Sequence, residues 1–316
     1  MRLSIIVVGA GYMGRAHCRV LSSLKDEYGV EIGAVVDPVL ERAEAAAKRF
    51  GGRAYASLED ALSNASYDAG VVASPTSTHL EVTEKLIREG VRYVLVEKPL
   101  ASSLEEAREF ASKHAGILDR IMVGHIERFN KGFRALLDSY RKGLLGDIVS
   151  ISARRVGPFT GRIRDAGVIL DLAIHDIDLI RTLCGEEPRA VLAYTYNIYS
   201  KEYEDSAHII LEFDKYVAHI EANRVTPFKE RRCIVTGTKG VAQLDFIQQS
   251  LNLYTGEWRM ERMLVWEEPL LVEDREFIKS VIEEAPVPIP YQEGLRALEI
   301  AWKAMESSRR GERILF

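Results

Sequence analysis

Over the first 125 residues, the hydrophobic positions alternate between two spacings. Short apolar runs rich in valine and isoleucine predict strands at residues 3–8, 31–36, 69–73, 93–96 and 121–123. Between these runs, apolar residues recur at helical spacing, which predicts helices at residues 13–24, 40–50, 57–62, 78–89 and 104–114. Strands and helices in this order form βαβ units, so we expect an α/β domain over residues 1–125 with a doubly wound parallel sheet.

The pattern changes after Asn130. Helical spacing returns at residues 132–141 and 168–183, on either side of an apolar run at 148–155. Further along, alternating positions separated by turn residues predict strands at 208–213, 217–223, 233–236, 241–246 and 251–254. Two more helices are predicted near 270–284 and 292–309. We therefore expect residues 126–316 to form an α+β domain on a large, mostly antiparallel sheet, with final helices that are able to pack back on the first domain.

Composition and charge narrow the class of protein. The chain has 316 residues, enough for two domains, and its 47% hydrophobic and 28% charged residues are typical of globular proteins. A formal net charge of −5 without a basic stripe argues against nucleic acid as a partner. No run approaches the roughly 20 apolar residues of a membrane span, and we expect no signal segment. Cys18, Cys184 and Cys233 lack the spacing of metal ligands, so we expect no metal site, reduced thiols that serve as small buried residues, and a cytoplasmic protein.

The most informative local signal is Gly9-Ala10-Gly11-Tyr12-Met13-Gly14, which directly follows the first predicted strand and opens the first predicted helix. A Gly-x-Gly-x-x-Gly motif is weak alone but informative in this context. Gly9 permits the tight turn, Gly11 lets backbone N–H groups approach a pyrophosphate, and Gly14 lets the helix pack closely on the strand. The helix N-terminus adds partial positive charge. The pattern predicts a dinucleotide-binding Rossmann domain in which these residues, Tyr12 and Met13 included, contact the cofactor, rather than a glycine-rich turn without a ligand.

The second predicted strand ends at Asp37, about 20 residues beyond the glycine loop, where an acidic residue commonly binds the adenosine ribose. A carboxylate at this place repels a 2′-phosphate, which favours NAD over NADP. The alternative is that Asp37 and Pro38 form a plain turn.

The apolar run at residues 93–96 continues into Glu97-Lys98-Pro99. Ligands of open α/β sheets bind beyond the carboxyl ends of the strands, so Lys98 lies where chemistry is expected. An ammonium there can hydrogen-bond a substrate hydroxyl and stabilise the alkoxide that develops. By itself, a lysine after a strand is more often a solvated surface charge.

Asp171 and His175 are four residues apart in the predicted helix at 168–183, so they share one helix face. Most other positions of this helix are apolar, and a carboxylate and an imidazole in such surroundings need partners. Histidine is well suited to moving a proton near neutral pH. Both residues are therefore catalytic candidates, although such a pair is more often a structural hydrogen bond. Asp178 is expected near the same face, and Asp176 away from it.

Together, the glycine loop, Glu97-Lys98-Pro99 and the Asp171–His175 pair have the order and spacing found in the Gfo/Idh/MocA oxidoreductases. Thr78-His79 and residues 124–130 fit the same family, and the chain resembles it over nearly its whole length. The resemblance implies NAD as cofactor, an open-faced sheet in the second domain, and a homodimer or homotetramer formed through that sheet.

The resemblance also implies roles for single residues. Lys98 would contact the reacting oxygen and position the substrate, His175 would take the hydroxyl proton as the hydride leaves, and Asp171 would hold the substrate or orient His175. The implied cofactor contacts outside the glycine loop and Asp37 are Ser74, Thr76, His79, Glu97 and Lys98.

Within the family, the chain looks most like the branch that oxidises UDP-N-acetylglucosamine at C3, to judge from residues 124–130, 155–159 and 162–167. Four arginines, at positions 154, 155, 162 and 164, precede the helix with Asp171, and a nucleotide diphosphate needs such cations. We therefore expect Arg155 and Arg164 to bind substrate, with a solvated arginine-rich loop as the alternative. Lys131 departs from the branch, in which proline is expected after Asn130.

The sequence thus predicts an NAD-dependent dehydrogenase that acts on a secondary alcohol of a sugar, with NADP the less favoured cofactor. A nucleotide sugar such as UDP-N-acetylglucosamine is the favoured substrate, and a free aldose or inositol is the alternative. An NAD-dependent glycoside hydrolase and a non-catalytic NAD sensor are less favoured, because no export segment is evident and Lys98, Asp171 and His175 occur together.

Overall fold

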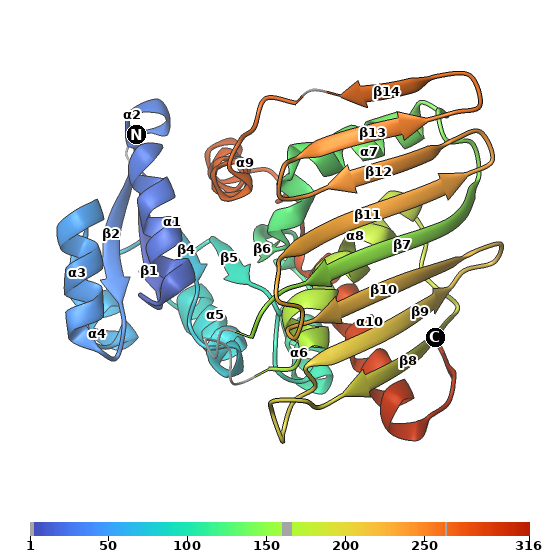
Figure 1. Ribbon diagram of the computed structural model, residues 1–316. Coiled ribbons are helices and arrows are strands. Elements are labelled where there is room, and N and C mark those ends of the chain that lie inside the picture. The colour runs from blue at the N-terminus through green and yellow to red at the C-terminus, as the bar shows by residue number, and fades with distance from the viewer. Residues whose placement is uncertain (1–2, 160–165, 263) are drawn as a thin grey trace. The chain divides into compact units, whose positions relative to one another are not determined.

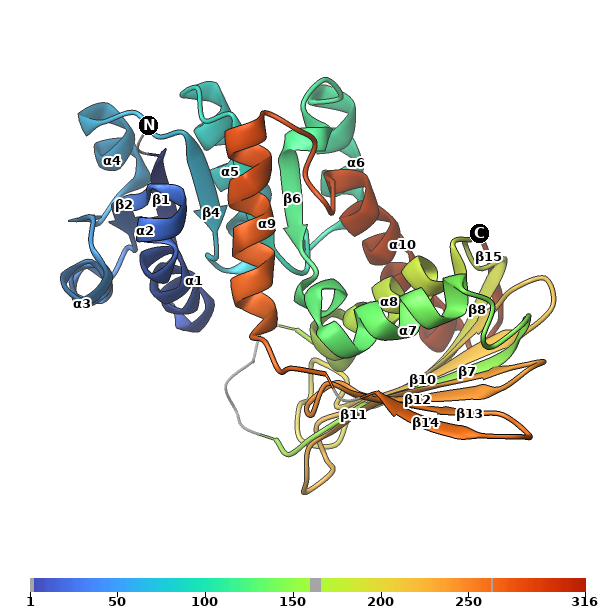
Figure 2. The same ribbon diagram turned by 90° about the horizontal axis from the view of Figure 1, so that it is seen from above.

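The computed structural model describes residues 3–159, 166–262 and 264–316. The chain divides into two compact units. The first consists of Met1–Ile126 and Leu270–Leu295, and the second of Glu127–Pro269 and Arg296–Phe316. The first unit therefore includes a late segment of the chain, from within the residues that the sequence assigned to the second domain. This segment contains most of helix α9 (Pro269–Glu283), drawn in orange in Figures 1 and 2, whereas the strands of the same unit are blue to green.

Among the described residues, the first unit contains a six-stranded sheet in the order β3-β2-β1-β4-β5-β6, and every neighbouring pair is parallel. The strands are β1 (Leu3–Val8), β2 (Val30–Val36), β3 (Arg53–Tyr55), β4 (Ala69–Val72), β5 (Tyr93–Glu97) and β6 (Ile121–Gly124). The predicted doubly wound parallel sheet is confirmed. Strand β3 was not predicted, because three residues that begin with Arg53 carry too little apolar pattern.

Helices cover this sheet on both faces, as the connections of a parallel sheet require. In chain order they are α1 (Tyr12–Ser23), α2 (Lys25–Tyr28), α3 (Leu40–Phe50), α4 (Leu58–Asn64), α5 (His79–Arg88), α6 (Leu104–Lys113) and α9. The central strands are accordingly buried, with Val7, Val71 and Leu95 at 0% exposure. The strand order reverses between β1 and β4, and the carboxyl edge at such a reversal is where open α/β sheets bind ligands.

The described residues of the second unit form a nine-stranded sheet in the order β14-β13-β12-β11-β7-β10-β9-β8-β15. Its strands are β7 (Ile148–Val156), β8 (Ala190–Tyr196), β9 (Ser206–Glu212), β10 (Val217–Asn223), β11 (Glu230–Gly237), β12 (Val241–Asp245), β13 (Ser250–Tyr254), β14 (Arg259–Arg262) and β15 (Ile314–Leu315). Strands β7 and β10 are parallel, and the other neighbouring pairs are antiparallel. The predicted mostly antiparallel sheet is confirmed, although the five candidate strands after residue 190 did not include β8, β14 or β15.

The two faces of this second sheet differ in burial, because side chains alternate along each strand. One row across seven strands is at most 2% exposed: Val191, Leu211, Ala218, Ile151, Val235, Ala242 and Leu253. The adjacent row is half-buried or exposed: Leu192, Ile210, His219, Ser152, Ile234, Gln243 and Asn252. Helices α7 (Lys131–Arg141), α8 (Ile174–Cys184) and the later part of α10 (Tyr291–Arg310) lie on the buried face (Figures 1 and 2).

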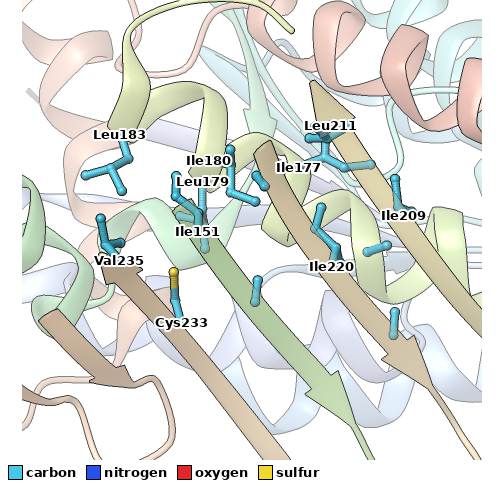
Figure 3. Close-up of a cluster of buried hydrophobic side chains, with 14 of the residues drawn as sticks. Ile151, Ile177, Leu179, Ile180, Leu183, Ile209, Leu211, Ile220, Cys233 and Val235 are labelled. Atoms are coloured by element: carbon cyan, nitrogen blue, oxygen red, sulfur yellow. The ribbon is translucent and has the colours of Figure 1, made fainter. Parts of the chain in front are cut away.

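Helix α8 supplies the centre of the second unit's core. In Figure 3, Ile177, Ile180 and Leu183 of this helix extend toward the strands, which contribute Ile151 and Val235. Burying one such side chain contributes about 1.5–3 kcal/mol. The core therefore fixes the helix that carries His175, one of the catalytic candidates.

From the sequence we expected no membrane-spanning segment and three cysteines that are reduced and buried. None of the helices that the structure describes is long and apolar enough to cross a bilayer. Cys18 and Cys233 are buried and Cys184 is half-buried, and all three thiols are free.

Candidate active site

The glycine loop joins β1 to α1 through contacts that a larger residue would block. Gly9 has a φ of +97°, and its N–H donates to the carbonyl of Val36 at 2.7 Å. A Cβ at Gly14 would lie 1.7 Å from the carbonyl oxygen of Gly9, so Gly14 is what allows α1 to approach the loop. A Cβ at Gly11, in contrast, would meet nothing within 4 Å. The backbone at Gly11 thus faces open space, as the approach of a pyrophosphate group requires.

Asp37 follows β2 and connects it to the glycine loop. Its carboxylate accepts the N–H of Ala10 at 2.8 Å through Oδ2 and the N–H of Val39 at 2.9 Å through Oδ1. The residue is 5% exposed. Each carboxylate oxygen has a second lone pair, so these bonds leave acceptor capacity for a ribose hydroxyl. The sequence argument for Asp37 did not include its contact with the loop.

The segment after β4 carries three of the expected cofactor contacts. Ser74 and Thr76 are partly exposed there, and the Ser74 hydroxyl accepts a hydrogen bond from Thr78 at 2.8 Å. His79 is different, because it is 1% exposed and its ring nitrogens lie 2.9 Å from the Ser74 carbonyl and 3.0 Å from the Pro99 carbonyl. Burial lowers the pKa of His79. The expectation of a direct cofactor contact is revised for His79, whose ring instead connects the segments that follow β4 and β5.

Lys98 follows the last residue of β5, at the carboxyl edge of the sheet. It is half-buried, and its peptide bond to Pro99 is cis. Its N–H donates to Oε2 of Glu97 at 3.1 Å, while Oε1 of Glu97 lies 3.0 Å from Nε2 of His17. Glu97 is 7% exposed and so lies beneath the edge at which Lys98 emerges.

The segment with Asp171 and His175 is helical, but its first turn differs from the predicted α-helix. Residues Ile169–Ala173 form a π-helix that continues into α8. An α turn takes about 3.6 residues and a π turn takes more than four, so residues four apart still fall near one face. Asp171 and His175 are accordingly partly exposed, whereas Ala173 and Ile174 between them are fully buried. Helix geometry is thus compatible with the predicted shared face despite the π turn.

The start of this π-helix is held by residues that the sequence did not single out. The Ile169 N–H donates to the Glu204 carboxylate at 2.9 Å, and the Val168 N–H to the Glu204 carbonyl at 3.1 Å. The adjacent Asp205 accepts three backbone N–H groups, from residues 198–200, and a bond from Arg224 at 2.6 Å. Burial acts to raise the pKa of Asp205, but these donors lower it to about 2. Local pattern carries no signal for the bond between Glu204 and the π-helix, since the two residues are 35 positions apart.

The structure corrects the expected role of Arg155 as a substrate-binding residue. It is 2% exposed, and its guanidinium bonds Asp176 at 2.8 and 3.1 Å and Glu127 at 2.8 Å. Burial raises the pKa of Asp176 in spite of Arg155. With both carboxylates bound, Arg155 closes a buried ionic cluster and is not available to a substrate diphosphate. Asp178 likewise bonds Arg128, at 2.8 Å.

Arg154 and Arg155, the two described arginines of the expected cluster, do not lie side by side. Residues 154 and 155 point to opposite faces of the sheet, because side chains alternate along β7. Arg154 bonds Glu221 at 2.8 Å and also pairs with Glu230. Arg162 and Arg164 lie outside the described residues, so the expected role of Arg164 stays a prediction.

Comparisons with known proteins agree with this fold. Residues 3–125 match the family model described as "Oxidoreductase family, NAD-binding Rossmann fold", and residues 133–243 match the GFO/IDH/MocA C-terminal domain. The UDP-N-acetylglucosamine 3-dehydrogenase of Acidithiobacillus ferrooxidans is 30% identical over 248 residues, which cover 78% of this chain and 75% of that protein. A solved structure of that dehydrogenase covers 98% of this chain and 99% of its own, with a TM-score of 0.86 and 28% identity. An inositol 2-dehydrogenase of Rhizobium meliloti is 28% identical over 95% of both chains.

The buried cluster leads to a prediction for Arg155→Met. The substitution leaves the buried carboxylate of Asp176 without its cation and leaves Glu127 only the longer contact with Arg231, at 3.4 Å. We therefore expect the free energy of unfolding to fall by about 3–5 kcal/mol. The matched control is Arg154→Met, because the Arg154 side chain is 34% exposed and the loss of its ion pairs should cost about 1 kcal/mol or less. Urea unfolding of both variants measures the difference. An Arg155→Met protein of wild-type stability with a raised substrate KM would restore the substrate role.

Proposed function

Because the chain belongs to the Gfo/Idh/MocA family of NAD-binding oxidoreductases, we propose that it is an NAD-dependent dehydrogenase of a sugar, and specifically of a nucleotide sugar such as UDP-N-acetylglucosamine, oxidised at C3. The observation that carries the proposal is the 30% identity to a UDP-N-acetylglucosamine 3-dehydrogenase, together with the presence of all three candidate catalytic residues. The relatives that are compared act on sugars or polyols, so the substrate class is narrower than alcohols in general.

The proposed chemistry assigns one task to each residue. Lys98 donates a hydrogen bond to the reacting oxygen and stabilises its developing negative charge. His175 takes the hydroxyl proton as general base, and Asp171 orients His175 or binds the sugar. NAD⁺, when bound, accepts the hydride and its electron pair from the carbon that becomes a carbonyl. Residues 9–14 and Asp37 fit that cofactor, since Gly11 faces open space and Asp37 keeps acceptor capacity.

Inositol is the second candidate substrate, and two observations favour it. The inositol 2-dehydrogenase of Rhizobium meliloti is similar over 95% of this chain. Arg155, which we expected to bind a diphosphate, is committed to Asp176 and Glu127. The case for a nucleotide sugar therefore depends on the similarity to the 3-dehydrogenase and on Arg164.

The substrate is tested by following NADH absorbance with purified protein. We expect UDP-N-acetylglucosamine to give a higher kcat/KM than other nucleotide sugars, glucose or inositol. Turnover of inositol or glucose alone would rule out the nucleotide sugar.

Lys98→Ala should lower kcat by about 100-fold or more, since it removes the donor to the reacting oxygen. Lys113→Ala is the control, because that exposed lysine pairs with Glu84 on the surface and should leave kcat unchanged.

The preference for NAD over NADP is proposed to come from Asp37. Asp37→Asn removes the negative charge that repels a 2′-phosphate but keeps an oxygen for the Ala10 N–H. We expect the ratio of the NADP Kd to the NAD Kd to fall by about tenfold, or 1.4 kcal/mol. Asp68→Asn is the matched control, because Asp68 also accepts a backbone N–H, that of Ser4 at 2.8 Å, at the other edge of the sheet. Equal ratios in the wild type and in Asp37→Asn would contradict the proposal.

The second unit is proposed to form a homodimer or homotetramer through the sheet face opposite α7 and α8. Aromatic and aliphatic side chains are exposed on this face, among them Tyr194 at 49% and Val217 at 47%. Val217→Glu places a charge on that face and is expected to shift the protein to monomer in light scattering after gel filtration. Ile247→Glu is the control, since Ile247 has the same 47% exposure but lies in the turn after β12. A monomeric wild type would contradict the proposal, as would equal masses for the two variants.

A further inference from the structure

Four ionisable side chains are buried together in the first unit, beneath the residue that we propose touches the reacting oxygen. His17 of α1 and Glu273 of α9 are 0% exposed, Asp274 of α9 is 1% exposed, and Glu97 at the end of β5 is 7% exposed. Buried charges are costly unless they are paired. The chemistry proposed above assigns no role to His17, Glu273 or Asp274.

Hydrogen bonds connect Asp274, His17 and Glu97 in series. Nδ1 of His17 lies 2.8 Å from Oδ1 of Asp274, and Nε2 of His17 lies 3.0 Å from Oε1 of Glu97. The other oxygen of Glu97 accepts the N–H of Lys98 at 3.1 Å. The series therefore runs from α9 through α1 to the backbone of Lys98. It joins residues 257 positions apart in the sequence, within one compact unit.

The proton positions follow from these neighbours. Both ring nitrogens of His17 face carboxylates, which accept hydrogen bonds, so both nitrogens carry a proton. Burial acts to lower the pKa of His17, but Asp274 and Glu97 outweigh it and raise the pKa well above its usual value. Burial likewise acts to raise the pKa of Glu97, and the hydrogen bond from His17 holds it below the usual value. The pair is thus an imidazolium and a carboxylate at neutral pH.

Glu273 completes the cluster without a hydrogen bond, since neither of its oxygens has a partner among the described residues. One of its oxygens, one of Glu97 and a nitrogen of His17 lie within 4.8 Å of one another, a spacing that could surround a metal ion. A metal would need a nitrogen lone pair, however, and His17 donates from both nitrogens. Burial and the charge of Glu97 raise the pKa of Glu273 well above its usual value, so it stays protonated. A doubly protonated His17 and a protonated Glu273 therefore make a poor metal site.

We propose that His17 is a positioning residue for the dehydrogenase reaction, because its bond to Glu97 fixes the carboxylate that holds the backbone of Lys98. This inference rests on the proposed role of Lys98. Without the Nε2 contact, Glu97 can turn its carboxylate away, and the Lys98 N–H loses its acceptor. The other bond of the ring, from Nδ1 to Asp274, anchors it against α9. That bond involves neither Glu97 nor Lys98.

Two variants of His17 separate these two bonds. The side-chain amide of asparagine replaces Nδ1 and that of glutamine replaces Nε2, so His17→Asn keeps the Asp274 bond and His17→Gln keeps the Glu97 bond. Each loses one buried bond to a carboxylate, so their melting temperatures should fall by similar amounts. We expect kcat to stay within about threefold of wild type in His17→Gln and to fall by about tenfold or more in His17→Asn, with KM for NAD unchanged. Equal kcat values in the two variants would overturn the inference.

The Lys98→Ala background distinguishes this inference from the function on which it rests. If Lys98 is the residue that His17 positions, His17→Asn lowers the residual kcat of Lys98→Ala no further. Full turnover by Lys98→Ala itself refutes the catalytic role of Lys98 on which the inference rests, and no NADH formation by the wild type refutes the proposed function. An impaired Lys98→Ala protein together with equal His17 variants refutes the positioning role alone.

A measurement on the wild type covers the case in which neither His17 variant folds. In protein labelled with ¹⁵N-histidine, NMR at pH 7 should show both ring nitrogens of His17 protonated. A His17 ring without a proton on Nε2 overturns the inference. So does a divalent metal that stays bound at one equivalent per chain after purification, measured by elemental analysis.

Discussion

The close approach of α1 to the glycine loop is the constraint on which the first unit depends. A Cβ at Gly14 would lie 1.7 Å from the Gly9 carbonyl, so any other residue would push the helix outward. The depth of α1 decides where His17 lies, and His17 in turn contacts Glu97 and Asp274. One steric condition in the cofactor loop thus sets the helix, its buried ionic cluster and the end of β5 together.

The second unit is organised by a different rule, the alternation of side chains across a large sheet. Buried and exposed rows follow one another across seven strands, and helices cover the buried face. The same alternation separates Arg154 from Arg155. One arginine joins the ionic cluster with Asp176 and Glu127, and the other pairs with Glu221. The helix with Asp171 and His175 packs on this sheet through its apolar side, which leaves the two polar residues on a partly exposed stripe.

Much of the fold could be predicted because its signals are local. Continuous apolar runs mark five strands of the first sheet: β1, β2, β4, β5 and β6. The glycine motif lies between a strand and a helix, and in that context it indicates a dinucleotide-binding loop. What could not be predicted depends on contacts between distant residues. The partners of Arg155 are Glu127 and Asp176, and those of His17 are Glu97 and Asp274. The opposite orientation of Arg154 and Arg155, by contrast, could have been inferred from the strand period, had it been applied to residues 148–155.

Because residues 270–295 belong to the first unit, that unit cannot be completed until late in translation. Domains generally fold as units during synthesis, with the N-terminal one first. Here the nucleotide-binding unit lacks α9 until residues 270–295 have left the ribosome, by which time nearly all of the second unit has been translated. Until then Asp274 is missing, and the buried His17 has no carboxylate on its Nδ1 side. A fragment cut after residue 126 would resemble this nascent state, with the early strands present and the ionic cluster incomplete.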